Sequence, residues 1–436
     1  MNYKEAIEYI HSTYKFGSKL GLDNIRFLLN LMGNPQESTR FIHVAGTNGK
    51  GSTSTFLSNI LMEEGYMVGL FTSPYLEVFN ERIRLNGINI ENADLATVTA
   101  FVKEQVDKML ALGMPHPTEF EIVTAIAMEF YKRKKVDYVI LEVGMGGRLD
   151  STNIIQKPLV SVITPIALDH TDYLGDTLGE IAYEKAGIIK KKSLVVAAPQ
   201  EDEAIDVITK RSEDLKSELV VADYTRIKNV RQHKNGSTFN ITIDEETLEN
   251  VEIHMIGDHQ VENASLALTV VSHLNRKYNM IISETSQREG LKKSRWPGRM
   301  EMIVDSPMVM IDGAHNLHGA KKLKENIERL FGNVKINAVV GILGDKDVSA
   351  ILSQMMPLCD KVFVTTPNNP RAMKAEDLYS QVSKLHDNVH LTASLENAVD
   401  SAIDEAGEGI LTLFFGSLYM IGDVRMRVLK KLGNKE

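Results

Sequence analysis

Cysteine and tryptophan are almost missing from this sequence, which has one residue of each, Cys359 and Trp296. A single cysteine excludes an internal disulfide and a cysteine-based zinc site, and it fits a reducing cytoplasm. No apolar run is long enough to cross a bilayer. The opening residues, MNYKEAIEYIHSTYKFG, alternate apolar and charged side chains at helical spacing, unlike a signal peptide. We therefore expect a globular, cytoplasmic enzyme that has no membrane partner.

Basic residues are the minority of the charged side chains. The chain has 49 Lys and Arg against 58 Asp and Glu, which gives a formal net charge of -9. Proteins that bind nucleic acids need a broad basic face, so this balance argues against a nucleic-acid partner. A local basic pocket for an anionic ligand remains compatible with it. The length of 436 residues exceeds the size at which a single core stops growing, so we expect two domains.

Short apolar strands alternate with amphipathic helices, a pattern typical of a parallel sheet covered on both faces. The first group of predicted strands covers residues 41–45, 67–72, 137–142, 159–164 and 194–197. Residues 224–252 alternate as antiparallel strands do and predict a small side sheet, which a helix over 259–278 follows.

The tripeptide Trp296-Pro297-Gly298 interrupts the periodicity, and we place a linker there, at about 296–298. Strands and helices alternate again beyond it, beginning with the strand MVMID. The prediction is an α/β protein with two doubly wound domains: a larger one over 1–295 that contains the side sheet, and a smaller, Rossmann-like one over 299–436.

A glycine-rich turn around Lys50 joins the first predicted strand to a helix, in FIHVAGTNGKGSTSTFLSNILMEEG. Backbone N–H groups and the helix N-terminus converge on such a turn and make it an anion site. The usual phosphate-loop spacing is not met, because Val44 stands five positions before Gly49 and because Gly51 follows Lys50. Ser52 supplies the hydroxyl one place late, so the stretch is a variant of that loop.

Other candidate residues follow the ends of predicted strands, where an open α/β sheet places its ligands. Glu142 ends one strand and is well placed to hold Mg²⁺, although an exposed strand-end carboxylate is an equal reading. Asp169 and His170 follow the next strand. Thr177 and Glu180 then have the spacing of a capping box, and the helix that follows carries Glu184 and Lys185. Taken singly, His170 reads as a turn histidine and Lys185 as a solvated helix lysine.

Six motifs together resemble the Mur ligase superfamily, and within it the folylpolyglutamate synthase and dihydrofolate synthase branch. In chain order they are GTNGKGS, TSPYLEVFNERI, LEVGMGGRLDSTN, LDHTDYLGDTLGEIAYEKAGIIK, RWPGRME and DGAHN. The resemblance covers nearly the whole chain. It also accounts for the variant loop, since that family uses G-T-x-G-K-[GST]-[ST], and it implies that the larger domain is P-loop ATPase-like.

The resemblance implies an ATP-dependent amide ligase. A carboxylate of dihydropteroate, of tetrahydrofolate or of both attacks the γ-phosphate of ATP, and the amine of L-glutamate then displaces phosphate from the acyl phosphate. A carboxylate needs this activation because its own leaving group would be oxide. The transferring phosphoryl group then needs cations around it, since electrostatic stabilisation does most of the work.

The resemblance also implies roles for individual residues. Those matching its ATP site are Gly49, Lys50, Gly51, Ser52, Asn263, Arg299 and Asp312, and those matching its magnesium ligands are Ser73, Glu142 and His170. Lys185 matches a lysine that carries a carbamate and helps to place a second Mg²⁺. His315 is expected near the γ-phosphate or the incoming glutamate. On the acceptor side we list Phe120 and Arg82 for a flat pteridine, with helix packing as an equal reading of Phe120.

Two rival functions remain open. A cell-wall ligase of the same superfamily would share the loop and Lys185, but it would ordinarily bring a further N-terminal domain, and only about forty residues precede the first predicted strand. A P-loop kinase or a nucleotide-binding switch would need neither Lys185 nor a second α/β domain with DGAHN. We expect a monomer whose only partners are small-molecule substrates.

Overall fold

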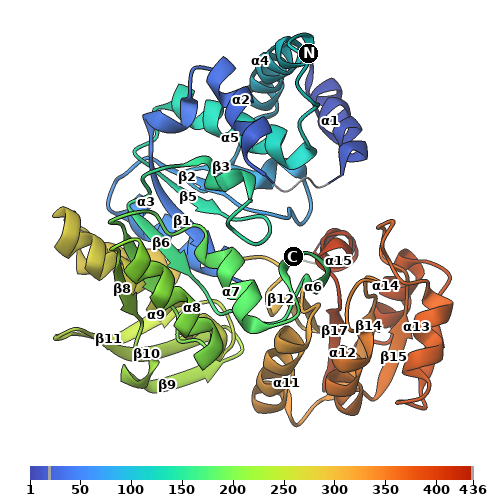
Figure 1. Ribbon diagram of the computed structural model, residues 1–436. Coiled ribbons are helices and arrows are strands. Elements are labelled where there is room, and N and C mark those ends of the chain that lie inside the picture. The colour runs from blue at the N-terminus through green and yellow to red at the C-terminus, as the bar shows by residue number, and fades with distance from the viewer. Residues whose placement is uncertain (18–20, 434–436) are drawn as a thin grey trace. The chain divides into compact units, whose positions relative to one another are not determined.

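The computed structural model describes residues 1–17 and 21–433 and divides into two compact units (Figure 1). Unit 1 consists of residues 1–228, 240–251 and 262–294. Unit 2 consists of residues 229–239, 252–261 and 295–436. Both units are built from sheets and helices that alternate along the chain, so the predicted α/β class is confirmed.

Unit 1 is built on an eight-stranded sheet with the order β4-β3-β2-β5-β1-β6-β7-β8. The strands are β1 (Arg40–Ala45), β2 (Val68–Phe71), β3 (Ile83–Leu85), β4 (Ile88–Asn89), β5 (Tyr138–Glu142), β6 (Val160–Ile163), β7 (Leu194–Ala197) and β8 (Glu218–Val221). The strands from β2 to β8 in this order run parallel, while β3 and β4 pair antiparallel to β2 and to each other. The sheet is therefore mixed, because Asn86 and Gly87, both at positive φ, close β3 and β4 into a tight hairpin.

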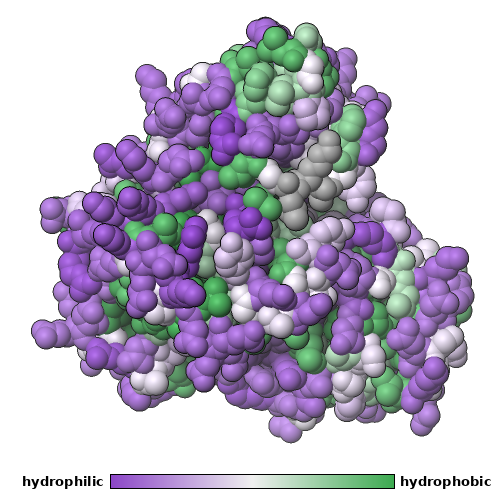
Figure 2. Space-filling view, in the orientation of Figure 1, coloured by the Kyte–Doolittle hydropathy of each residue, from purple (hydrophilic) through white to green (hydrophobic). Residues whose placement is uncertain are grey.

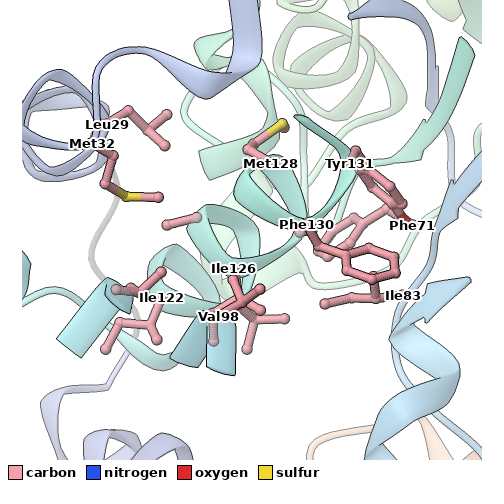
Figure 3. Packing of buried hydrophobic residues seen from close by; sticks show 14 of the residues in the cluster. Leu29, Met32, Phe71, Ile83, Val98, Ile122, Ile126, Met128, Phe130 and Tyr131 are labelled. Carbon is pink, nitrogen blue, oxygen red and sulfur yellow. The ribbon is translucent and has the colours of Figure 1, made fainter. Parts of the chain in front are cut away.

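One apolar cluster of unit 1 lies between the sheet and four helices. They are α1 (Tyr3–Ser12), α2 (Asp23–Leu31), α4 (Asn92–Ala111) and α5 (Glu119–Lys134). Figure 3 shows side chains of α5, among them Phe130 and Tyr131, directed toward Phe71 of β2 and Ile83 of β3. Because α5 is buried along most of its length, it fixes the positions of β2 and β5, whose ends carry Ser73 and Glu142.

Further helices of unit 1 complete the cover of the sheet. A second apolar cluster packs α7 (Leu178–Ala186) and α8 (Asp202–Asp214) against β1, β6 and β7. The short helix α6 (Thr171–Leu174) precedes α7 in the chain. The helix α3 (Lys50–Glu63) contacts β1, β2 and β5 and packs closely on α10 (Glu284–Lys293). The predicted capping box of Thr177 and Glu180 at the start of α7 is confirmed.

The predicted side sheet is confirmed as three strands in the order β11-β10-β9. They are β9 (Ile227–His233), β10 (Gly236–Ile243) and β11 (Glu246–Ile253), and the helix α9 (Asp258–Tyr278) follows them.

Unit 2 is built on a six-stranded sheet with the order β12-β13-β17-β14-β15-β16. The strands are β12 (Glu301–Asp305), β13 (Met308–Asp312), β14 (Lys335–Val340), β15 (Lys361–Val364), β16 (Val389–Leu391) and β17 (Ile410–Phe415). All pairs are parallel except β12 with β13, so a parallel core again carries an antiparallel edge.

Helices cover both faces of the sheet in unit 2. A buried cluster packs α11 (Leu317–Phe331), α12 (Val348–Met355) and α13 (Ala375–Val382) on one face. The helices α14 (Leu395–Asp404) and α15 (Leu418–Leu432) contact strands of the same sheet. The smaller doubly wound fold expected for this part of the chain is thus present.

Hydrophobic side chains on the surface are scattered. The face in Figure 2 is mainly hydrophilic, and its hydrophobic side chains form small groups. No described helix combines the length and the apolar character that a bilayer span requires.

Candidate active site

The loop between β1 and α3 is held against the segment that follows β6. The backbone N–H groups of Thr47 and Asn48 donate to Pro165 O at 3.0 and 3.3 Å. The hydroxyl of Thr47 contacts both backbone groups of Ala167, at 3.0 and 3.1 Å. Gly46, at φ 151°, leaves no room for a side chain, since a Cβ there would lie 1.8 Å from Thr164 Oγ1. The loop is therefore fixed by hydrogen bonds to the segment after β6, and position 46 has room only for glycine.

Lys50 lies over this loop and not out in solvent. Its ammonium donates to the backbone carbonyls of Gly46 and Thr47, both at 3.2 Å. The preceding Gly49 adopts φ 84°, a left-handed conformation that glycine allows without strain. A Cβ on Gly49 would also lie 2.4 Å from Asn263 Oδ1 of α9, so Asn263 lies directly against the loop. Lys50, Gly49 and Asn263 are thus brought together, and Ser52 is buried on the first turn of α3.

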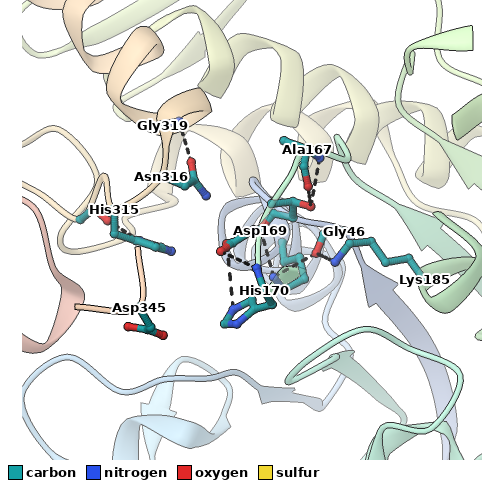
Figure 4. Close-up of polar contacts among 12 residues, drawn as sticks. Gly46, Ala167, Asp169, His170, Lys185, His315, Asn316, Gly319 and Asp345 are labelled. Atoms are coloured by element: carbon teal, nitrogen blue, oxygen red, sulfur yellow. Dashed lines mark hydrogen bonds and ion pairs between the residues drawn. The ribbon is translucent and has the colours of Figure 1, made fainter. Parts of the chain in front are cut away.

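Lys185 reaches the same loop from α7. Its Nζ donates to Gly46 O at 2.8 Å, as Figure 4 shows, so Lys50 and Lys185 share one carbonyl acceptor. Only 4% of Lys185 is exposed. Burial, and then the charge of Lys50, lower the pKa of the Lys185 amine from 10.5 to about 7, while Asp169 and Asp150 oppose that shift. A large fraction of this amine is therefore neutral near pH 7, so the solvated-lysine reading is excluded.

Glycines allow the last turn of α7 to approach the loop that follows β5. A Cβ on Gly147 would lie 2.8 Å from Glu184 O and 2.9 Å from Lys185 O. The N–H of Arg148 donates to Glu184 O at 2.7 Å, and the Arg148 guanidinium pairs with the Glu184 carboxylate at 2.8 Å. These contacts fix the distance between the end of α7 and the loop after β5, and with it the position of Lys185.

Asp150 forms a buried polar network that was not predicted from the sequence. Its carboxylate accepts from Met145 N at 2.9 Å and from the N–H and the hydroxyl of Thr152 at 2.9 and 2.5 Å. The Thr152 hydroxyl also contacts His43 Nε2 at 2.9 Å. Since the Thr152 proton goes to Asp150, His43 must donate, and burial lowers the pKa of His43 to about 3. The D-S-T sequence of an Asx turn was the available signal.

Ser73 and Glu142 meet at the carboxyl ends of neighbouring strands. The Ser73 N–H donates to Glu142 Oε2 at 3.3 Å, and Glu142 is only 4% exposed, which excludes the exposed-carboxylate reading. His170, at φ 54°, lies in the segment after β6, where its N–H donates to Asp169 Oδ1 at 2.9 Å and its ring faces the same carboxylate (Figure 4). Among the described residues, no group of three or more His, Cys, Asp and Glu side chains has the arrangement of a metal site.

Unit 2 holds its predicted residues in a turn after β13. The Asp312 carboxylate accepts from Met300 N at 2.8 Å and from Ala314 N at 2.7 Å, and Arg299 lies against Gly313. Burial raises the pKa of Asp312, and the charge of Arg299 opposes this. His315 Nδ1 contacts Gly313 O at 2.7 Å, while Asn316 caps α11 by accepting from Gly319 N at 2.8 Å (Figure 4).

The two residues expected on the acceptor side lie in different surroundings. Phe120 packs on Phe71, with 6.0 Å between ring centroids, and a Cβ on Gly144 would lie 2.6 Å from its ring. The Arg82 guanidinium lies over the rings of Tyr75 and Phe79, at 5.2 and 5.7 Å from their centroids. Phe120 is thus in contact with the apolar cluster, and Arg82 is held on an aromatic surface.

Two family models match this chain. The model of the Mur ligase middle domain matches residues 44–271, and that of the Mur ligase glutamate ligase domain matches residues 298–418. Both matched segments contain site residues described above, including Lys50 and Lys185 in the first and Asp312 in the second.

Curated and solved proteins are similar to this chain over its full length. The dihydrofolate synthase/folylpolyglutamate synthase of Bacillus subtilis is 38% identical, over 98% of this chain and 99% of that protein. The folylpolyglutamate synthase of Mycobacterium tuberculosis complexed with ADP has a TM-score of 0.89 and 30% identity, over 98% of each chain. An Escherichia coli protein in complex with DHPP and ADP has a TM-score of 0.87 and 29% identity, over 99% of this chain and 98% of that one.

Proposed function

This chain belongs to the Mur ligase family, and we propose that it is a folylpolyglutamate synthase that also acts as a dihydrofolate synthase. It would use ATP to join L-glutamate to a carboxylate of tetrahydrofolate and of dihydropteroate. The observation that carries the proposal is the meeting of Lys50 and Lys185 at one carbonyl of the glycine loop, Gly46 O, at 3.2 and 2.8 Å. A kinase needs the first of these lysines and has no use for the second, buried one.

The loop of Gly49, Lys50, Gly51 and Ser52 would bind the ATP phosphates. Its backbone N–H groups and the N-terminus of α3 supply partial positive charge, and the Lys50 ammonium would move from its two carbonyl acceptors to the terminal phosphates. Asn263 lies against Gly49 and would contact the nucleotide beside the loop. Two relatives solved in complex with ADP support nucleotide binding by this chain.

Magnesium would be held by Ser73, Glu142 and His170. The contact between Ser73 N and Glu142 Oε2 brings a hydroxyl-bearing residue and a buried carboxylate together, and oxygen ligands suit this ion. Imidazole suits it less, so His170 is the weakest member of the set. When bound, magnesium would neutralise the charge that develops on the transferring phosphoryl group.

Lys185 would carry a carbamate. Its neutral amine can attack carbon dioxide, forming an N–C bond and releasing one proton, and the pKa of about 7 supports that reaction at neutral pH. The product is an anion within reach of the loop, which suits a second magnesium site where an ammonium would repel the ion.

In unit 2, Arg299 and Asp312 would contribute contacts to the nucleotide, and His315 would serve the γ-phosphate or the incoming glutamate. The Asp312 carboxylate fixes the turn that carries Arg299 and His315 by accepting two backbone N–H bonds. Domain boundaries of 1–295 and 299–436 remain part of the proposal, and the family matches at 44–271 and 298–418 support them.

The acceptor would bind beside Arg82 and Phe120. The Arg82 guanidinium would pair with carboxylates of the acceptor. The Tyr75 ring, which lies beneath that guanidinium, would offer a flat surface to the pteridine ring. We also propose that the protein is monomeric and cytoplasmic. Cys359, the single cysteine, is a free thiol, which fits a reducing cytoplasm.

The test is phosphate release from ATP by the purified protein with dihydropteroate or tetrahydrofolate present. We expect release to depend on both L-glutamate and the pteridine acceptor, with a product heavier by one glutamate residue for each acceptor. Release that ignores glutamate would overturn the proposal in favour of a kinase or a nucleotide switch. Release that requires a UDP-sugar peptide would favour a cell-wall ligase.

A further inference from the structure

The loop from Ser73 to Arg82 encloses a carboxylate of its own chain. Glu81 accepts hydrogen bonds from three consecutive backbone N–H groups, those of Leu76, Glu77 and Val78, each at 2.9 Å. Its side chain is 15% exposed, and its carboxylate also pairs with Arg84 at 3.9 Å. The three hydrogen bonds from these amides to the carboxylate are strong, because the acceptor is charged. Glu81 therefore stabilises the conformation of the loop that surrounds it.

The same loop is fixed to its surroundings by the two residues before Glu81. Asn80 accepts from Tyr3 OH at 2.9 Å and donates to Ile90 O at 2.5 Å. Phe79 is buried in the apolar cluster of unit 1. The segment is thus anchored at one side, and the bonds to Glu81 determine how the stretch from Leu76 to Val78 folds back over that anchor.

The two ends of this loop carry residues of the proposed site. At one end, the Ser73 N–H donates to Glu142. At the other, Arg82 lies over the rings of Tyr75 and Phe79, so its guanidinium depends on where the loop places Tyr75. Both oxygens of Glu81 accept from backbone N–H groups, so its carboxylate acts on its own loop.

We propose that Glu81 is a positioning residue that holds the loop from Ser73 to Arg82 in the conformation that binds the pteridine acceptor. The inference rests on the proposed function for the identity of that acceptor. In the Glu81→Gln variant, an NH₂ group would replace one carboxylate oxygen and face a backbone N–H, which removes at least one bond and adds a repulsion. The loop would then open at Leu76–Val78 while the anchors at Phe79 and Asn80 stay in place.

The test compares Glu81→Gln with Glu91→Gln as the matched control. Glu91 undergoes the same loss of charge nearby, at the start of α4, where its side chain makes no capping bond. We expect Glu81→Gln to raise KM for dihydropteroate by about tenfold, the loss of one charge-assisted hydrogen bond, with KM for ATP within about twofold of wild type. Glu81→Asp, with the charge kept, should recover part of that loss, and Glu91→Gln should match wild type.

Hydrogen exchange of the amides of residues 76–78 gives a readout that does not depend on activity. Glu81→Gln should lose protection at these amides, and Glu91→Gln should keep it. Unchanged protection would overturn the inference, and so would an equal rise of KM for both substrates, which would indicate a general loss of folding. A wild-type protein without glutamate-dependent turnover would instead refute the proposed function, and the exchange result would still decide the role of Glu81 in the loop.

Discussion

The carboxyl edges of the two main sheets are built by different means. In unit 1, residues far apart in sequence meet: Lys185 donates to Gly46, and His43 contacts Thr152. In unit 2, the contacts after β13 span shorter stretches of chain. Ala314 donates to Asp312 and Gly319 to Asn316, and the bond from Met300 to Asp312 spans 12 residues. The first edge is assembled by tertiary packing, and the second is a turn followed by a helix cap.

The two edges also differ in how deeply they bury their candidate reactive groups. Burying Lys185 between α7 and the glycine loop brings its pKa to about 7, a value that favours chemistry at neutral pH. The turn in unit 2 orients polar groups but gives His315 no comparable enclosure: it is half-buried beside its own backbone. We infer that unit 1 carries the reactive chemistry and that unit 2 orients ligands, and three substitutions can break or sharpen that contrast.

The largest effect is expected for Lys185→Ala. Removing the buried amine leaves no group for a carbamate, so kcat should fall by about 100-fold to 1,000-fold, as for other preorganised electrostatic groups. The matched control is Lys191→Ala, an exposed lysine just beyond α7. Steady-state rates and circular dichroism would check the prediction. Near-normal turnover in Lys185→Ala would remove the carbamate from the mechanism.

The pH dependence of the wild type tests the same residue. The Lys185 pKa is lowered from 10.5 to about 7, so the neutral share of this amine falls as the pH drops through that value. Activity at a fixed concentration of dissolved carbon dioxide should therefore fall as the pH drops below 7. A rate that stays level from pH 8 to pH 6 would contradict a reactive neutral amine.

A smaller effect is expected for Gly147→Ala. The added Cβ would lie 2.8 Å from Glu184 O and 2.9 Å from Lys185 O, and these backbone atoms can move only if the end of α7 moves. Displacing Lys185 by about 1 Å should cost roughly tenfold to 100-fold in kcat. Gly407→Ala is the control, since a Cβ there meets no atom within 4 Å. Equal kinetics for both variants would show that activity does not depend on the close approach of α7 to Gly147.

Much of this architecture could be predicted from the sequence because its signals are local. The strand ends, the capping box at Thr177 and the strand MVMID all depend on neighbours within a few residues, and the structure confirms them. The β3–β4 hairpin was missed although Asn86-Gly87 is a hairpin signal, and the sheet was therefore expected to be parallel throughout.

The network around Lys185 could not be predicted, because it depends on distances across the fold. The contact between His43 and Thr152 joins residues 109 positions apart, and nothing near either residue indicates the other. Burial of Lys185 is likewise a property of packing, since the helix α7 exposes Tyr183 two residues earlier. The motif resemblance supplied roles for Lys50 and Lys185, and it left their shared acceptor, Gly46 O, unforeseen.

The smallest effect is expected for Asp312→Asn, which tests the orienting role of unit 2. Both oxygens of Asp312 accept from backbone N–H groups, so the ionised form fits the turn even though burial raises its pKa. Asparagine would place an NH₂ group against one of those donors, loosening the turn beside Arg299. We expect KM for ATP to rise severalfold, kcat to change little, and the exposed control Asp305→Asn to match wild type. A collapse of kcat as large as that of Lys185→Ala would overturn the contrast, because unit 2 would then share the reactive chemistry with unit 1.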